Sequence, residues 1–265
     1  MRGGAVAVGA AYAVSELELR LRVRDGEVFL AFPEWADGAT PRALFDAPAI
    51  AGRGEYLNIG YNLQQITPHE WSAERWRAYI DELALAKLNR FYFYLWIDTY
   101  SMNPASELSE RPLNRQIHER VQEAIAYAKL RGLDVTYMFC PSYFPKDIWE
   151  AHPEMQADIE YVQHGFPAVC SRAPGAWEMM LENARSEFAW FKEADAIQLW
   201  FYDPGGCWCE RNGCKEHQAE TLARQVTAFS ALFREFNPEA RVEFNYWPMW
   251  LWEEIQGVKY REDMD

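Results

Sequence analysis

The strongest constraint on the fold is a repeated order of strand-like and helix-like segments, whose strands have two unlike faces. In one strand, Phe91, Phe93 and Leu95 alternate with Tyr94 and Trp96. Helical segments separate the expected strands, and such strand–helix units predict a parallel sheet with helices outside it. The expected strands are residues 56–62, 91–98, 134–140, 196–203 and 241–247. Thr67-Pro68-His69-Glu70 has capping-box spacing and is expected to begin the first of these helices.

The two faces favour a barrel over a doubly wound sheet, whose strands are apolar on both sides. The aliphatic face suits outer helices, and the aromatic, amide and carboxylate face suits the inside of a TIM-type (β/α) barrel near its mouth. The alternative is a parallel sheet with one wet face, which is rare. About five units are expected, whereas a complete barrel has eight in about 250 residues. We therefore expect an α/β fold with an incomplete barrel, from a truncated chain.

The first 50 residues are expected to be separate from this barrel. Ala10, Val14, Leu17 and Leu21 share one helical face, and residues 27–30 are a strand candidate. Residues 33–48 are rich in Pro, Asp, Gly and Ala, which is typical of a connector. We place a domain boundary near residue 50.

The charge of the chain excludes several partners. Lys and Arg number 26 against 40 Asp and Glu, so the net charge is −14. This acidic balance argues against nucleic acid and an anionic membrane surface. The five cysteines are an odd number, and no convincing signal peptide is present, so cytoplasmic is the default location. Oligomeric state is left open.

Three carboxylates are candidates for catalysis. Asp203 ends a strand and enters the turn Pro204-Gly205-Gly206, Asp98 ends another strand, and Glu243 lies on an inward face. Catalytic groups in barrels lie at the carboxyl ends of strands, and two carboxylates across a pocket are what glycoside hydrolysis needs. The alternatives are that Asp203 only initiates its turn, and that the others are partners of a barrel Arg or Lys.

Aromatic residues make up 15% of the chain, more than a core needs. Rings pack against the C–H groups of sugars, and amides bind hydroxyls. We expect a sugar subsite lined by residues at the barrel mouth: Asn62, Tyr94, Trp96, His164, Trp200, Tyr202, Asn245 and Trp247.

A cysteine-rich loop is the candidate metal site. Cys207, Cys209, Cys214 and His217 offer thiolates and an imidazole, which suit a structural tetrahedral zinc. The alternative is that these cysteines are reduced and pack a tight loop. Glycoside hydrolysis by carboxylates is expected to require no cofactor. Cys170 and Cys140 are expected to be buried thiols. His118 is expected on a helix surface.

The chain resembles glycoside hydrolases of the beta-N-acetylhexosaminidase and alpha-glucuronidase group, in which a small α/β domain precedes a (β/α)8 barrel. The resemblance rests on residues 9–17, 53–57, 76–84 with 87–89, 169–174 and 203–207. It implies that residues 1–50 are the end of the accessory domain with a linker, and that 51–265 form part of the barrel. It also implies that Arg53 binds hydroxyls of a terminal sugar.

One departure from the group narrows the expected chemistry. Hexosaminidases carry Gly-Gly-Asp-Glu after the fourth strand, whereas this chain has Asp203-Pro204-Gly205-Gly206 without an adjacent Glu. This argues against acetamido-assisted catalysis. The leading interpretation is a glycosidase of carbohydrate metabolism that removes a terminal hexosamine or uronic acid from a glycan. The alternatives are a non-catalytic glycan-binding or inactive fragment, and a metal-dependent hydrolase.

Overall fold

The computed structural model describes residues 21–24, 27–30, 50–60, 67–159, 167–201 and 207–245. Two of these segments form a small antiparallel sheet of β1 (Leu21–Arg24) and β2 (Glu27–Leu30). The strand expected at residues 27–30 is therefore present. Leu21 begins a strand and pairs with Leu30, so the helical face predicted for Leu21 is wrong.

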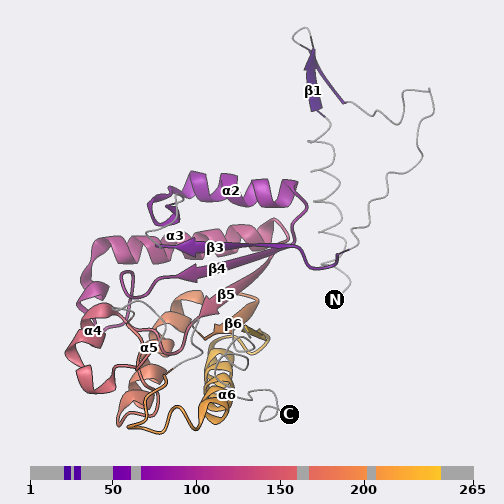
Figure 1. The fold of residues 1–265 in the computed structure, drawn as a ribbon. Helices are drawn as coiled ribbons and strands as arrows, with labels where there is room; N and C mark the ends of the chain where they lie inside the picture. The colour runs from indigo at the N-terminus through magenta and orange to yellow at the C-terminus, as the bar shows by residue number, and fades with distance from the viewer. Residues whose placement is uncertain are drawn as a thin grey trace.

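Within the described residues, five parallel strands form the main sheet, and they lie side by side in chain order (Figure 1). The strands are β3 (Gly54–Ile59), β4 (Arg90–Leu95), β5 (Asp134–Phe139), β6 (Ala196–Trp200) and β7 (Arg241–Asn245). All five overlap the strands expected from the sequence. β4 ends before its expected limit because the backbone turns at Trp96, whose carbonyl accepts hydrogen bonds from the amides of Thr99 and Tyr100.

The main helices form a single layer. They are α2 (Ala73–Leu85), α3 (Pro112–Leu130), α5 (Ala176–Phe191) and α6 (Gln218–Phe236). α2 packs against α3, α3 against α5, and α5 against α6. Sequential parallel strands with helices following one another along one face are the arrangement found in (β/α) barrels, and they differ from a doubly wound sheet. No helix in the described ranges is long and apolar enough to cross a membrane.

Helix α2 begins later than the sequence predicted. Residues Pro68–Glu70 form a short 3-10 turn, η2, and the side chain of Thr67 makes no capping hydrogen bond. Ser72 caps α2 instead, with its hydroxyl accepting from the amide of Arg75 at 3.3 Å. The capping-box spacing at Thr67 was therefore misleading, because a second cap residue stands five positions later.

Short helices also occur in the segments that connect the strands to the main helices. They are η3 (Glu107–Glu110), α4 (Lys146–Ala151) and η4 (Pro153–Met155). Asp147 of α4 binds η3, because its carboxylate accepts from the hydroxyl of Ser106 at 2.7 Å and from the amide of Glu107 at 2.7 Å. These contacts order two of the loops at the carboxyl end of the sheet.

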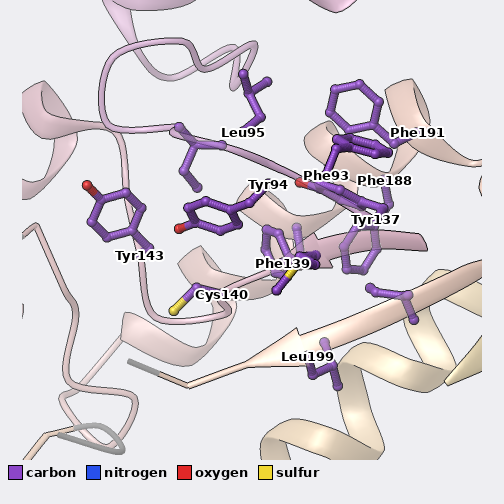
Figure 2. Close-up of a cluster of buried hydrophobic side chains, with 14 of the residues drawn as sticks. Phe93, Tyr94, Leu95, Tyr137, Phe139, Cys140, Tyr143, Phe188, Phe191 and Leu199 are labelled. Carbon is purple, nitrogen blue, oxygen red and sulfur yellow. The ribbon is translucent and has the colours of Figure 1, made fainter. Parts of the chain in front are cut away.

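The face of the sheet turned toward the helices is filled by aromatic rings. Phe93 lies 5.3 Å from Phe191 between ring centroids, Tyr137 lies 4.8 Å from Phe191, and Phe139 lies 4.8 Å from Phe188. Figure 2 shows Phe93 grouped with Phe188 and Phe191, whereas Tyr94, the next residue along β4, turns toward Tyr143. The period of two in the sequence therefore separates a helix-facing core from an inward face, as predicted.

A buried polar cluster joins α3 to α5. His118 and Glu187 are fully buried, and Nε2 of His118 lies 3.2 Å from Oε2 of Glu187. The other oxygen of Glu187 accepts from the hydroxyl of Ser101 at 3.0 Å and the amide of Met102 at 3.2 Å. The expectation that His118 lies on a helix surface is wrong, because this carboxylate satisfies the imidazole inside the core.

Replacing Glu187 tests the contribution of this cluster. We expect Glu187→Leu to lower the free energy of unfolding by about 3–5 kcal/mol, because buried donors would lose their acceptor. Glu187→Gln keeps an acceptor oxygen and should cost less than half as much. Urea unfolding measures both variants, with the exposed Glu182→Leu on the same helix as a control that should change stability by less than about 0.5 kcal/mol. Equal losses for the Gln and Leu variants would contradict this account.

Candidate active site at the carboxyl end of the sheet

The inward residues of the sheet lie in register across all five strands. Asn58 pairs with Tyr94, Tyr94 with Met138, Met138 with Gln198, and Gln198 with Glu243. This row crosses the sheet at one level. Trp96, Trp200 and Asn245 each lie two positions further along their own chain segments, and Trp200 pairs with Asn245. The sequence-predicted Tyr94, Trp96, Trp200 and Asn245 therefore share the inward face near the carboxyl end.

Aromatic rings meet on this face through edge-to-face contacts. The ring centroid of Tyr94 lies 5.2 Å from that of Trp200 and 5.4 Å from that of Trp96. Trp96 in turn lies 5.5 Å from Tyr143. These tilted arrangements are favourable for aromatic quadrupoles. Tyr94, Trp96 and Tyr143 are buried and Trp200 is partly exposed, so Trp200 presents an accessible part of this cluster.

Asn58 fixes the orientation of Trp96. The indole Nε1 of Trp96 donates a hydrogen bond of 2.6 Å to the side-chain oxygen of Asn58, and both residues are buried. Asn58 belongs to the polar face of β3, the first strand of the parallel sheet, so the alternation in the sequence was a signal for it. Tyr143 carried no such signal, because it lies in a loop without periodic pattern. Neither was among the predicted site residues.

Asp98 lies three residues beyond β4, at the same end of the sheet. Burial raises the pKa of its carboxyl group above the usual value of 3.8, and hydrogen bonds from Tyr143 and Thr99 oppose that rise. Its Oδ1 is buried and has no hydrogen-bond partner in the described ranges. A carboxyl group of this kind holds a proton more readily than an exposed one, which suits a general acid.

Glu243 does not face Asp98. Its carboxylate lies 3.7 Å from the guanidinium groups of both Arg90 and Arg241, the first residues of β4 and β7. It also accepts a hydrogen bond of 3.3 Å from Gln198. Glu243 therefore points toward the amino-terminal edge of the sheet. This corrects its predicted role as a second catalytic carboxylate and supports the alternative of a partner for barrel arginines.

Arg53 also lies at the amino-terminal edge, directly before β3. Its guanidinium donates to the carbonyl of Lys87 through Nε at 3.0 Å and Nη2 at 2.6 Å, and to the carbonyl of Ile50 at 2.5 Å. Strand β3 spans six residues, about 20 Å, between this position and the carboxyl end. The role implied for Arg53 in binding sugar hydroxyls is therefore corrected: it anchors the loop after α2.

Several predicted residues lie outside the described ranges, so their placement stays a prediction: Asn62, His164, Tyr202, Asp203 and Trp247. Asp203 follows β6 by three residues in the sequence, as Asp98 follows β4. Because β4, β5 and β6 are consecutive parallel strands, both aspartates follow strands that end at the same edge of the sheet.

A cluster of four cysteines lies in the loops at this end of the sheet. The sulfur atoms of Cys170, Cys207, Cys209 and Cys214 all lie within 4.8 Å of one another, and all four residues are buried. The structure therefore brings together the three cysteines predicted for the metal site, and it adds Cys170, which was not predicted. His217 is corrected as a ligand, because its side chain is 47% exposed and its Nδ1 lies 3.2 Å from Glu220.

The crowding of these thiols affects their ionisation. Hydrogen bonds from the thiols of Cys207 and Cys214 lower the pKa of Cys170. The hydrogen bond to Cys170 in turn raises the pKa of Cys207 to about 12, and the same interaction raises the pKa of Cys214. One thiolate in the cluster thus opposes the formation of others next to it.

Comparisons with solved structures support the α/β fold described above. The sequence matches no protein-family model and no curated protein. The structure is similar to a GH20 exo beta-N-acetylglucosaminidase from Vibrio harveyi, with a TM-score of 0.58 and 16% identity over 89% of this chain. It is also similar to a beta-N-acetylhexosaminidase from Bacteroides fragilis, with a TM-score of 0.55 and 15% identity over 89% of this chain.

The chain therefore shares the fold of GH20 beta-N-acetylhexosaminidases, which confirms the resemblance found in the sequence. It spans 40% of the Vibrio enzyme and 48% of the Bacteroides enzyme. A Flavobacterium johnsoniae chitobiase is similar over the same share of this chain, with a TM-score of 0.51 and 15% identity. At these identities the similarity concerns the fold, and activity is a separate question.

The raised pKa of Asp98 predicts a pH-dependent effect of Asp98→Asn. The folded protein binds this proton more tightly than the unfolded chain, so wild-type stability falls as pH rises through the folded pKa. We expect the variant to be more stable than wild type at pH 7, with the difference disappearing below about pH 3.8. Urea unfolding at several pH values measures this. A variant that is less stable than wild type at pH 7 would contradict the prediction.

Proposed function

We propose that the protein is a glycoside hydrolase that removes a terminal sugar of the hexosamine or uronic acid class from a glycan. The observation that carries this proposal is the ring cluster of Tyr94, Trp96 and Trp200 on the inward face, which Tyr143 joins to Asp98, a carboxyl group with a raised pKa. Ring faces and a carboxyl group that is protonated more readily than usual, at the carboxyl end of parallel strands, match what sugar cleavage requires. The fold shared with GH20 enzymes supports the same class.

In the proposed mechanism, a sugar ring packs against the accessible part of Trp200. Burial raises the pKa of Asp98, so this carboxyl group takes up a proton more readily than an exposed one, and in its protonated form it delivers that proton to the oxygen of the leaving group. Asp203, which follows β6, supplies the second carboxylate for nucleophilic attack, for activation of water or for charge stabilisation. The reverse assignment, with Asp203 as the acid, uses the same two groups.

Two observations bear on the class of sugar, and they point in different directions. The Vibrio harveyi enzyme is described in complex with N-acetylglucosamine, which favours a hexosamine. The sequence after β6 reads Asp203-Pro204-Gly205-Gly206 and has no adjacent Glu, which argues against acetamido assistance, so a uronic acid is kept as the second class. Both classes therefore belong in the test of activity.

A second candidate function is glycan binding without turnover. Glu243 is held by two arginines at the other end of the sheet, so of the three predicted carboxylates the described ranges place Asp98 alone at the candidate site. Hydrolysis by carboxylate pairs needs two. If Asp203 does not face Asp98, the aromatic residues would still bind a sugar.

Activity assays on aryl glycosides separate the two functions. The panel contains aryl N-acetylglucosaminides, N-acetylgalactosaminides and glucuronides of both anomers. We expect wild-type turnover of at least one substrate, and a loss of kcat/KM of at least about 100-fold in Asp98→Asn and Asp203→Asn, because each removes an acid or base group. Glu243→Gln is the matched control and should lose much less.

Outcomes of this assay are distinct. Wild-type activity that survives Asp203→Asn removes Asp203 from the mechanism, and activity that survives Asp98→Asn removes Asp98. If no substrate is cleaved, calorimetry with the free monosaccharides tests binding. Binding that Trp200→Ala weakens by about tenfold or more, equivalent to about 1.4 kcal/mol, would favour the non-catalytic function.

A further inference from the structure

The four-cysteine cluster is separate from the proposed sugar chemistry and has a geometry of its own. Sγ of Cys170 lies 3.4 Å from Sγ of Cys214 and 3.7 Å from Sγ of Cys209, and no pair of sulfurs exceeds 4.8 Å. The cysteines come from two loops. Cys170 precedes α5, and the other three lie between β6 and α6.

These distances match a single tetrahedral metal site. Zinc binds thiolate sulfur at about 2.3 Å, and a regular tetrahedron of that radius has edges of about 3.8 Å. A disulfide needs about 2.05 Å between sulfurs, and none of the four cysteines is disulfide-bonded. A four-iron cluster binds its thiolates through four different irons, which requires wider separation than one shared ion.

The surroundings of the sulfurs fit negatively charged ligands. The amides of Asp158 and Cys209 donate to Sγ of Cys207 at 3.3 and 3.5 Å, and the side-chain amide of Asn212 donates to Sγ of Cys170 at 3.3 Å. Arg172 donates to the carbonyl of Asn212 at 3.0 Å, which helps to hold the residue whose side-chain amide reaches Cys170. Hydrogen bonds of this kind orient thiolate ligands and tune their basicity.

We propose that Cys170, Cys207, Cys209 and Cys214 bind one structural zinc ion. All four ligands are cysteines and all are buried, which is typical of a closed structural site and leaves no open position for catalysis. Zinc at this position cross-links the loop before α5 to the loop before α6. Cys207 stands four residues after Asp203, so the ion anchors the far end of the segment that carries this candidate catalytic residue.

Metal analysis of the purified full chain tests the site. The chain is expressed with zinc in the medium, dialysed without chelator and analysed by mass spectrometry of elements. We expect about one zinc per chain, and a thermal midpoint that falls by more than about 5 °C when a strong chelator removes it. Less than about 0.1 zinc per chain, or stoichiometric iron in its place, would overturn the proposal.

Matched variants identify the ligands. Cys170→Ser should retain less than half of the wild-type zinc after mild chelator challenge, whereas Cys140→Ser should retain all of it, because Cys140 lies outside the cluster. His217→Ala should also retain all of it. Full retention by Cys170→Ser together with loss by His217→Ala would overturn the four-cysteine assignment and restore the set predicted from the sequence.

A readout on the wild-type chain covers the case in which Cys170→Ser does not fold. Cobalt(II) in place of zinc should give the intense visible bands and near-ultraviolet charge transfer of a tetrahedral tetrathiolate site. Chelator should release zinc and expose four thiols together to a thiol reagent. A cobalt spectrum of an octahedral oxygen site, or thiols that react before zinc is released, would contradict the proposal. None of these readouts depends on sugar cleavage.

Discussion

Backbone pairing between the parallel strands is the constraint on which the rest of the structure depends. The register Asn58–Tyr94–Met138–Gln198–Glu243 puts every second residue of the five strands on one face. A slip of one residue in any strand would exchange its inward and outward side chains. The helix-facing core needs Phe93, Tyr137 and Phe139 on one side, and the candidate site needs Tyr94 and Trp200 on the other. One register therefore places both the helix-facing core and the candidate site.

Much of this arrangement could be predicted from the sequence because it depends on local periodicity. The alternation of Phe93 and Tyr94 reports which face is covered by helices, and the strand–helix order implies parallel strands in sequential positions. It follows that inward residues near the carboxyl ends, such as Trp96 and Trp200, lie on one face of the sheet, where both contact Tyr94. The inward position of buried Asn58 is predictable from the same alternation. Its hydrogen bond to Trp96 follows from the pairing of β3 with β4.

The errors concern interactions between residues distant in the sequence. The alternation places Glu243 on the inward face, but it does not indicate toward which end of the sheet the carboxylate points. In the structure the carboxylate lies near Arg90 and Arg241, at the amino-terminal edge. A compact spacing brought His217 into the predicted metal set, whereas the fold brings in Cys170 from a loop 37 residues before Cys207. His118 was predicted at the surface because polar helix residues usually are, and its buried partner Glu187 lies 69 residues away.

The central claim is that the inward aromatic face at the carboxyl end of the sheet receives a sugar ring. Crystals of the full chain soaked with N-acetylglucosamine and, separately, with glucuronic acid test it most directly. The account predicts difference density for one of these sugars against the ring of Trp200, with a hydroxyl or ring oxygen within hydrogen-bond distance of Asp98. Sugar density elsewhere on the molecule, with Trp200 covered by protein, would contradict it.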